Sequence, residues 1–190
     1  MDKEKELLAA ALKLFVEFGF HGTPTSKIAK EAGVANGTLF HYFKTKEELI
    51  VKLYIRIKEE LNGHMLSKLD DQTPLEIRMK TVYEESIQWA LVHRDEFYFI
   101  QQFHFSPHLA KVSAEDLEKQ TRMHAALLGE GVESRIFKAL PVNLIGTLLA
   151  SQLYGVHQYL VNNDLPVSKQ KEVIDETFVL LWQMITNIKS

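Results

Sequence analysis

Residues 25 to 43 contain two short helical segments separated by only about three residues. The first begins at Thr25, which we expect to be its N-cap, and ends before Gly33, because glycine readily adopts the left-handed conformation. The second runs from about Asn36 to Phe43. Two short helices joined by a tight, glycine-containing turn are typical of a helix-turn-helix when a longer helix precedes them.

The rest of the chain also has the periodicity of helices, so we predict an all-α fold of about nine helices. The first helix is expected to stop at Gly19, and the fourth to start at Lys46 or Glu47. Further joints are predicted at Gly129 and Gly131. The remaining helices are expected at about 75–93, 95–105, 114–129, 141–162 and 168–188.

Charge is distributed unevenly along the 190 residues, whose net charge is -3. Residues 1–58 hold ten Lys/Arg and seven Asp/Glu, and residues 59–190 hold twelve and eighteen, so the two parts carry +3 and -6. This asymmetry indicates a small anion-facing module attached to a larger acidic body. The chain has no cysteine, which excludes disulfides, thiolate metal sites and a cysteine nucleophile.

One stretch, residues 139–163, has no formal charge and is long enough to span a bilayer. It carries Asn143, Gln152 and His157, however, and lipid would leave these polar groups poorly satisfied. We therefore expect a helix buried by protein and no membrane partner. The N-terminal apolar run is interrupted by Lys13 and Glu17, which argues against a secretion signal, and we expect a cytoplasmic protein.

Three ordered sets of residues carry a resemblance to a known family. They are Ala10 to Phe15 with Phe18-Gly19-Phe20, then Thr25, Ile28-Ala29 and Ala32-Gly33-Val34, then Gly37 to Lys44 with Lys46 to Leu49. Over residues 5–50 the chain resembles the TetR family of bacterial transcriptional regulators. The resemblance implies a helix-turn-helix DNA-binding domain, residues 1–46, and a larger helical ligand-binding and dimerisation domain, residues 47–190.

The second short helix divides into two faces. Leu39 and Phe43 lie four residues apart and share the inner face, whereas the resemblance places Tyr42 and Lys46 on phosphates and Thr38 near base edges. The predicted DNA-binding residues are Thr25, Ser26, Lys27, Asn36, Gly37, Thr38, Phe40, His41, Tyr42 and Lys46. The chain departs from the family at Ala35, which replaces the usual serine, and at Phe40, which replaces the usual tyrosine.

Aromatic and polar residues of the later helices are candidates to line a ligand cavity, because such cavities are mostly apolar with a few polar anchors. The predicted ligand-binding residues are Trp89, Tyr98, Phe99, Gln102, Phe103, Tyr154 and His157. His104 and His108 have a spacing that can suit a metal, but Pro107 between them breaks the helix. We therefore predict no metal site and no cofactor.

Two functions remain open on this basis. The first is a DNA-binding transcriptional regulator, a repressor that binds a palindromic double-stranded operator as a homodimer through its last two helices. A small hydrophobic or aromatic effector would release it. The alternative is an all-α small-molecule-binding or protein-interaction protein with a vestigial DNA-binding unit, which Ala35 and Phe40 would favour. An enzyme is not expected, because no nucleophile motif, phosphate loop or His-Glu-x-x-His motif is present.

Overall fold

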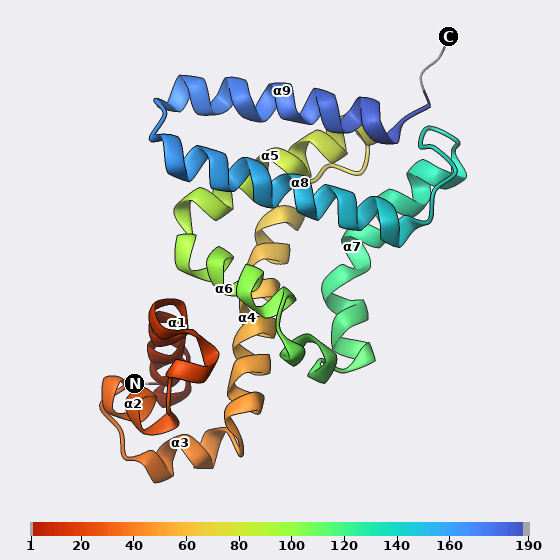
Figure 1. Cartoon of the computed structure of the whole chain (residues 1–190). Coiled ribbons are helices and arrows are strands. Elements are labelled where there is room, and N and C mark those ends of the chain that lie inside the picture. Colours follow the sequence, from red (N-terminus) through yellow and green to blue (C-terminus); the bar gives the residue numbers. More distant parts are fainter. Residues whose placement is uncertain (1, 188–190) are drawn as a thin grey trace. The chain divides into compact units, whose positions relative to one another are not determined.

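A computed structural model describes residues 2–187, and every regular element among them is a helix (Figure 1). An isolated antiparallel bridge between Phe137 and Thr186 is the one β-type pairing in this part of the chain. The helices form two compact units. Unit 1 contains the residues up to Glu60 together with His93–Leu117, and unit 2 contains Leu61–Val92 and the residues from Glu118 onward. The predicted all-α fold is confirmed.

Helix α1, Lys3–Gly22, buries one apolar face and changes direction near its end. Leu7, Ala11 and Phe15 are fully buried on that face. Gly19 has φ +70°, a left-handed conformation that ends the regular helix before one further turn. The predicted stop at Gly19 therefore marks a real break in the backbone.

Helices α2, Thr25–Glu31, and α3, Asn36–Tyr42, form the expected helix-turn-helix. Gly33 has φ +66° in the turn between them. The prediction that Thr25 is the N-cap is wrong, because Thr25 is already the first helical residue. Pro24 precedes it in an extended conformation and has no side-chain oxygen to cap the helix.

Helix α4, Lys46–Leu66, begins where the sequence predicted and has its own capping contacts. The backbone N–H of Glu48 donates to Oγ1 of Thr45 at 3.0 Å. The carboxylate of Glu48 accepts from the backbone N–H of Lys44 at 2.7 Å. This reciprocal arrangement resembles a capping box and fixes the start of α4 directly after α3.

The second half of unit 1 consists of α6, Arg94–His104, and the short 3-10 helix η1, Pro107–Lys111. Helix α6 packs against α1. The ring of Phe99 lies 6.2 Å from that of Phe15 and 5.6 Å from that of Phe20, measured between centroids. By packing, α6 therefore belongs with the N-terminal helices, while the functional division into residues 1–46 and 47–190 stays a prediction.

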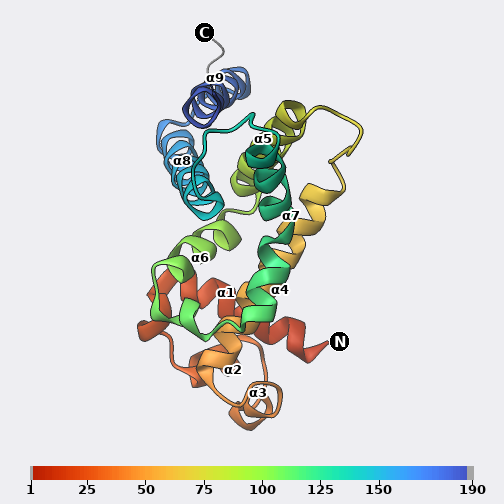
Figure 2. The ribbon, with the colours of Figure 1, turned by 90° about the vertical axis from the view of Figure 1, so that its right-hand side faces the viewer.

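Unit 2 contains α5, Leu75–Val92, most of α7, Ala114–Glu133, and the pair α8, Val142–Asn163, and α9, Val167–Ile185. Helices α8 and α9 pack side by side and both contact α5 (Figure 2). Residues buried at the centre of this core include Tyr83, Ile87, Leu128, Phe137, Ile145, Leu160, Ile174, Phe178, Leu181 and Ile185. The five later helices lie close to their predicted positions, and residue 188 of the last one lies outside the described residues.

The predicted joint at Gly129 and Gly131 is wrong, because both residues lie inside α7. The chain turns afterwards, where Arg135 adopts φ 59°. Gly131 is buried, and the ring of Phe137 packs directly over its Cα. This glycine therefore serves close packing and not chain reversal.

Across residues 2–187 no helix combines the length and the apolar character that a bilayer crossing requires. Helix α8, which covers most of the uncharged stretch, buries Ile145, Val156, His157 and Leu160. The Nε2 atom of His157 lies 3.2 Å from the backbone carbonyl oxygen of Ala90 in α5. The buried imidazole of this stretch is thus held by a contact within unit 2.

Candidate nucleic-acid interface

Helix α3 presents two chemically different faces. Leu39 and Phe43 are 0% and 1% exposed, so they hold the helix on the core of unit 1 as predicted. The opposite side carries Phe40, His41 and Tyr42, all of which are exposed. Asn36 and Gly37 are also exposed and Thr38 is half-buried. All six α3 residues predicted to contact DNA therefore retain surface that a partner could reach.

The first turn of α3 has no side-chain cap. Ala35 occupies the N-cap position in an extended conformation and contributes no side-chain hydrogen bond. The N–H groups at a helix start lack intrahelical partners and carry partial positive charge. Without a serine hydroxyl, these groups are left to water or to an anion. This feature matches the departure from the family pattern noted in the sequence.

Two contacts brace the helix-turn-helix, and sequence reasoning missed both. The Oγ1 hydroxyl of Thr23 is fully buried and donates to the carbonyl oxygens of Leu14 and Gly19 at 3.0 and 2.9 Å. The ammonium of Lys13 pairs with the carboxylate of Glu31, joining α1 to α2 at 2.5 Å. The contact of Thr23 could have been predicted from the sequence, because threonine side chains often donate to a backbone carbonyl four residues earlier.

The predicted contacts on α2 differ in availability. Ser26 is exposed and Thr25 is half-buried. Lys27 places its ammonium over the ring of Phe18, 3.1 Å from the centroid, in a cation–π contact. Phe18 is itself 43% exposed, so the pair lies at the surface. Lys27 is therefore oriented by an aromatic ring before any partner binds.

Lys46 is the first residue of α4 and lies four residues after Tyr42, the last residue of α3. Its side chain is half-buried, and this burial lowers its pKa, while the neighbouring carboxylate of Glu47 acts in the opposite direction. The ring of Tyr42 makes edge contact with His41, with centroids 5.4 Å apart. Lys46 and Tyr42 thus provide a cation and a hydroxyl at the C-terminal side of α3, the two groups that suit phosphate oxygens.

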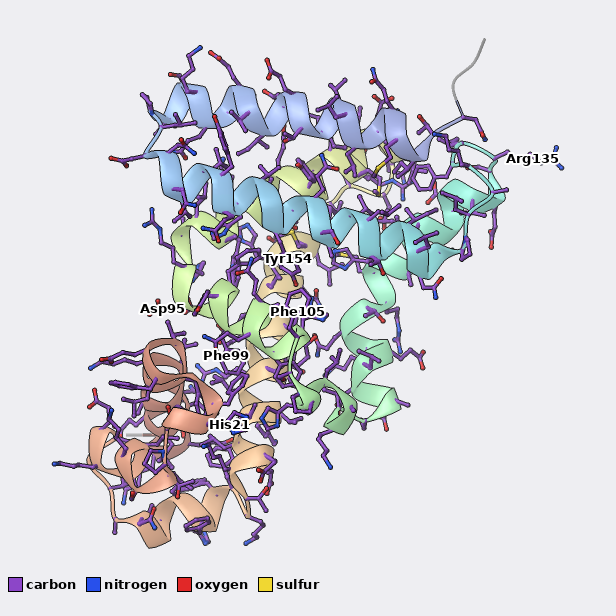
Figure 3. All side chains as sticks on the ribbon, in the orientation of Figure 1. His21, Asp95, Phe99, Phe105, Arg135 and Tyr154 are labelled. Atoms are coloured by element: carbon purple, nitrogen blue, oxygen red, sulfur yellow. The ribbon has the colours of Figure 1, made fainter. Side chains whose placement is uncertain are left out.

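Four of the predicted ligand-binding residues belong to α6 in unit 1. Phe99 and Phe103 are fully buried, and Phe103 stacks on Tyr54 of α4 with centroids 3.9 Å apart. Tyr98 is 48% exposed and Gln102 is half-buried. The structure therefore places the two phenylalanines in the aromatic core that joins α6 to α1 and α4. Figure 3 labels Phe99.

The other three predicted ligand-binding residues belong to unit 2. Trp89 of α5 is 5% exposed, and Tyr154 of α8 is half-buried. His157 is 7% exposed, with Nε2 against the carbonyl oxygen of Ala90. Their assignment to a ligand site stays a prediction, as does that of the α6 residues.

The two histidines considered for a metal lie in different elements. His104 ends α6, whereas His108 lies in η1 after Pro107. The ring of His108 packs edge-on against Phe20 with centroids 5.1 Å apart. Within residues 2–187 no group of three or more His, Asp or Glu side chains is arranged to hold a metal ion.

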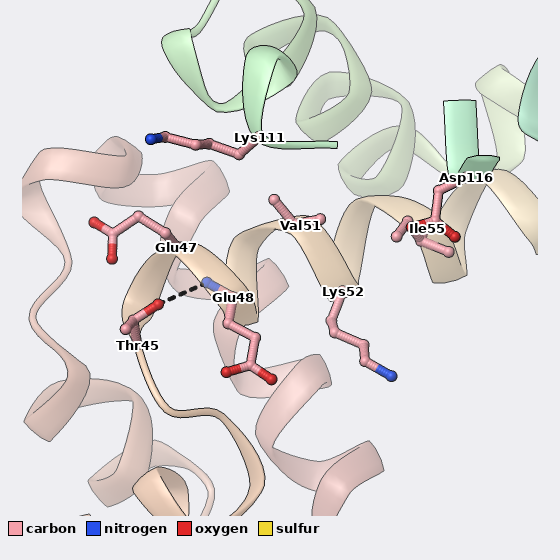
Figure 4. Close-up of a pocket in the computed structure, with 8 residues that line it drawn as sticks. All are labelled: Thr45, Glu47, Glu48, Val51, Lys52, Ile55, Lys111 and Asp116. Atoms are coloured by element: carbon pink, nitrogen blue, oxygen red, sulfur yellow. Dashed lines mark hydrogen bonds between the residues drawn. The ribbon is translucent and has the colours of Figure 1, made fainter. Parts of the chain in front are cut away.

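A surface groove of about 610 Å³ runs along the first turns of α4 (Figure 4). Its lining includes acidic and basic side chains, namely Glu47, Glu48, Lys52, Lys111 and Asp116, together with Thr45, Val51 and Ile55. Sequence reasoning did not identify this groove, because it depends on η1 and the start of α7 meeting α4. Because acidic and basic side chains both line this groove, its charge does not favour one class of ligand.

Comparison with known proteins relates the N-terminal segment to a described family. The family described as bacterial regulatory proteins, tetR family, matches residues 7–53. The fatty acid metabolism regulator protein of Bacillus subtilis (strain 168) is 35% identical over 95 residues, which cover 50% of this chain and 44% of that protein. The repressor KstR2 of Mycobacterium tuberculosis is 29% identical over 150 residues, which cover 74% of this chain and 72% of that protein.

The first curated relatives are matched over less than half of their own length, 44% for the Bacillus protein and 34% for the regulator RutR of Escherichia coli. Solved structures match the whole chain. A tetR family transcription regulator from Shewanella sp. PV-4 has a TM-score of 0.91 and 28% identity, and covers 98% of this chain and 100% of that one. FadR of Bacillus subtilis in complex with stearoyl-CoA has a TM-score of 0.75 and 22% identity, and covers 97% of this chain and 99% of that one. This similarity shows that the two proteins share a fold.

Proposed function

Because the chain belongs to the TetR family of bacterial regulatory proteins, we propose that it is a DNA-binding transcriptional repressor of the cytoplasm. The observation that carries the proposal is the division of α3 into a buried face, Leu39 and Phe43, and an exposed face ending in Tyr42. A helix held in this way can enter the major groove, where each base pair shows a distinct donor and acceptor pattern.

We further propose that a small apolar or aromatic effector releases the protein from DNA. Two similar proteins support an apolar effector, since one is named a fatty acid metabolism regulator and another was solved with stearoyl-CoA. Helix α4 is continuous from unit 1 into unit 2, so it can transmit a change between them. The effector must bind the released form better than the DNA-binding form, by roughly 5.5 kcal/mol to shift a 1:99 equilibrium to 99:1.

The alternative function, a binding protein with a vestigial DNA unit, is favoured by two observations. Ala35 leaves the first turn of α3 without a side-chain cap, and Phe40 offers no hydroxyl to a phosphate. Both features would weaken contact with DNA. They leave Tyr42 and Lys46 in place, so we favour the repressor.

Operator binding tests the proposal directly. We expect a gel shift with the DNA upstream of its own gene, and we expect the affinity to fall steeply as salt is raised. Lys46→Ala should weaken binding to every sequence by roughly tenfold and reduce the salt slope by about one, because one phosphate contact is lost. Asn36→Ala should instead change the ranking of operator variants.

Lys68→Ala provides the matched control, because Lys68 is an exposed lysine of unit 2 outside the helix-turn-helix. Its operator affinity should equal that of the unsubstituted protein. If DNA binding is absent, or insensitive to both salt and sequence, the repressor proposal is wrong and the alternative stands.

We propose a homodimer through α8 and α9, because both helices carry exposed apolar side chains. On α9, Leu180 and Met184 lie one turn apart and are 63% and 40% exposed. On α8, Leu144 and Tyr159 are 43% and 50% exposed. Two-fold symmetry would place two α3 helices on half-sites about 34 Å apart in a palindromic operator.

Sedimentation of the Leu180→Glu variant tests this interface. The introduced carboxylate would be buried without a partner at the interface, so we expect the dimer dissociation constant to rise by about a hundredfold or more. Lys169→Glu, which also introduces a carboxylate but at a charged and exposed position at the start of α9, should leave the dimer intact. Equal dissociation constants for both variants would place the interface elsewhere.

A further inference from the structure

Gln120 is a buried glutamine on the apolar face of α7. It is 1% exposed, and the other buried residues of this helix are Leu127, Leu128 and Gly131. An apolar side chain would suit such a position better, because burying an amide costs free energy unless its polar atoms are hydrogen-bonded. The Nε2 atom of Gln120 is buried and has no hydrogen-bond partner within residues 2–187. This buried donor therefore calls for an explanation other than packing.

Asn62 of α4 lies against Gln120, and the two residues are linked by two hydrogen bonds. The Nδ2 atom of Asn62 donates to the backbone carbonyl oxygen of Gln120 and to its side-chain Oε1, both at 3.0 Å. Both residues belong to unit 2. The Oδ1 atom of Asn62 is buried and accepts no hydrogen bond in the part of the chain that the structure describes. The linked amides therefore keep one buried acceptor and one buried donor without partners.

Turning over either amide does not pair these two atoms. The backbone carbonyl of Gln120 can only accept, so the atom of Asn62 that lies 3.0 Å from it must be the nitrogen. The same nitrogen lies 3.0 Å from the Gln120 side chain, so the atom that faces it must be the oxygen. The hydrogen bonds thus fix both amides, and they leave Oδ1 of Asn62 and Nε2 of Gln120 available to a further group.

The residues around this pair are apolar and include one adaptable side chain. Leu61 and Met65 lie on α4 beside Asn62 and one turn after it, and they are 9% and 1% exposed. Leu127, two turns after Gln120 on α7, is 6% exposed. A methionine is unbranched and repacks at low cost, so Met65 can make room for an apolar chain. Apolar surroundings with a few polar anchors are typical of sites for small molecules.

We propose that Asn62 and Gln120 bind a carboxamide group of the effector. Its N–H donates to Oδ1 of Asn62, and its carbonyl oxygen accepts from Nε2 of Gln120. A carboxamide carries its donor and its acceptor on separate atoms, as the pair on the protein does. This inference rests on the proposed effector control and adds that the apolar effector is a neutral amide.

Charged groups match this pair of atoms poorly. A carboxylate has no hydrogen to donate and would bring negative charge beside Oδ1 of Asn62. An ammonium cannot accept from Nε2 of Gln120 and would bring positive charge beside that donor. Either ion would also be withdrawn from water without a counter-charge from the two amides, which is costly. The site therefore discriminates against the acid and the amine that match a given amide.

Calorimetric titration with four probes of equal chain length tests the proposal on the full chain without DNA. The probes are octanamide, methyl octanoate, octanoate and octylammonium. Methyl octanoate is neutral and can accept but cannot donate, so it separates hydrogen bonding from charge. We expect octanamide to bind about tenfold more tightly than each of the other three, because it alone satisfies both buried atoms.

Gln120→Met removes the donor at nearly constant volume. It should weaken octanamide binding by about tenfold and leave the affinity for methyl octanoate within about threefold of that of the parent protein. The variant is expected to fold, because methionine is common in protein cores and the substitution removes an unpaired buried N–H. Gln72→Met is the matched control, since Gln72 is an exposed glutamine in the turn before α5. It should keep the preference for octanamide unchanged.

Nuclear magnetic resonance of the side-chain amides gives a readout that needs no variant. In the 15N-labelled parent protein, saturating octanamide should shift the assigned Nε2 proton signals of Gln120 and slow their exchange with water, because a new hydrogen bond forms there. The corresponding signals of Gln72 should not move. A change at Gln120 alone would place the amide of the probe at the proposed site.

Three results would overturn the proposal: equal or absent binding of all four probes, an unchanged octanamide preference in Gln120→Met, or unmoved Gln120 signals at saturation. Each would mean that water alone satisfies the two buried atoms. These results are distinguishable from a failure of the repressor proposal. Operator binding without octanamide preference would leave the repressor and remove the site, whereas octanamide preference without operator binding would do the reverse.

Discussion

Phe99→Ala is expected to lower the free energy of unfolding of unit 1 by about 3 to 5 kcal/mol, the usual loss for a buried phenylalanine. Phe99 is fully buried, and its ring contacts those of Phe15, Phe20 and Phe103. Its removal leaves a cavity where α6 meets α1, and close-packed helices fill such a cavity only by shifting toward each other. Urea denaturation followed by circular dichroism measures the loss as a lower midpoint.

Phe105→Ala is the matched control, because it makes the same chemical change six residues later on a side chain that is 86% exposed (Figure 3). Its free energy of unfolding should lie within about 0.5 kcal/mol of that of the parent protein, as for most surface substitutions. If both variants lose the same stability, α6 does not contribute to the core of unit 1 as the structure describes.

Gly131→Ala is expected to destabilise unit 2 by about 1 to 3 kcal/mol, the range for overpacking a close-packed core. A Cβ atom at this position would overlap the ring of Phe137, which is 1% exposed and makes edge contact with Trp182. The ring cannot retreat easily, because the backbone N–H of Phe137 donates to the carbonyl oxygen of Gly131 at 2.8 Å. Thermal denaturation and tryptophan fluorescence both report the change.

Gly129→Ala is the control for this prediction, since a Cβ atom there meets nothing within 4 Å and the residue lies in the same helix. It should stabilise the helix by up to about 1 kcal/mol, because alanine favours helix over glycine. The double variant Gly131→Ala with Phe137→Leu should recover part of the loss. Equal stability of the two single variants would contradict the close approach of Phe137 to α7.

The amino-acid pattern by itself determined the local structure of this protein. Helical periodicity, Gly19 and Gly33 predicted the positions of the helices, because a left-handed residue and an apolar repeat act over a few neighbouring residues. The same local rule divided α3 correctly, with Leu39 and Phe43 buried and Tyr42 exposed. Where a residue's role depended on its neighbours in sequence, prediction was mostly sufficient; the N-cap of α2 is the exception, because it is Pro24 and not Thr25.

Only the tertiary structure decided which helices form a common core. The sequence predicted a helix end at Gly131. The residue instead lies within α7, where the ring of Phe137, six residues later, packs against it. Phe99 lies in a core with α1, more than seventy positions away in the chain. Such contacts join residues distant in sequence, and no local pattern encodes the desolvation that they impose.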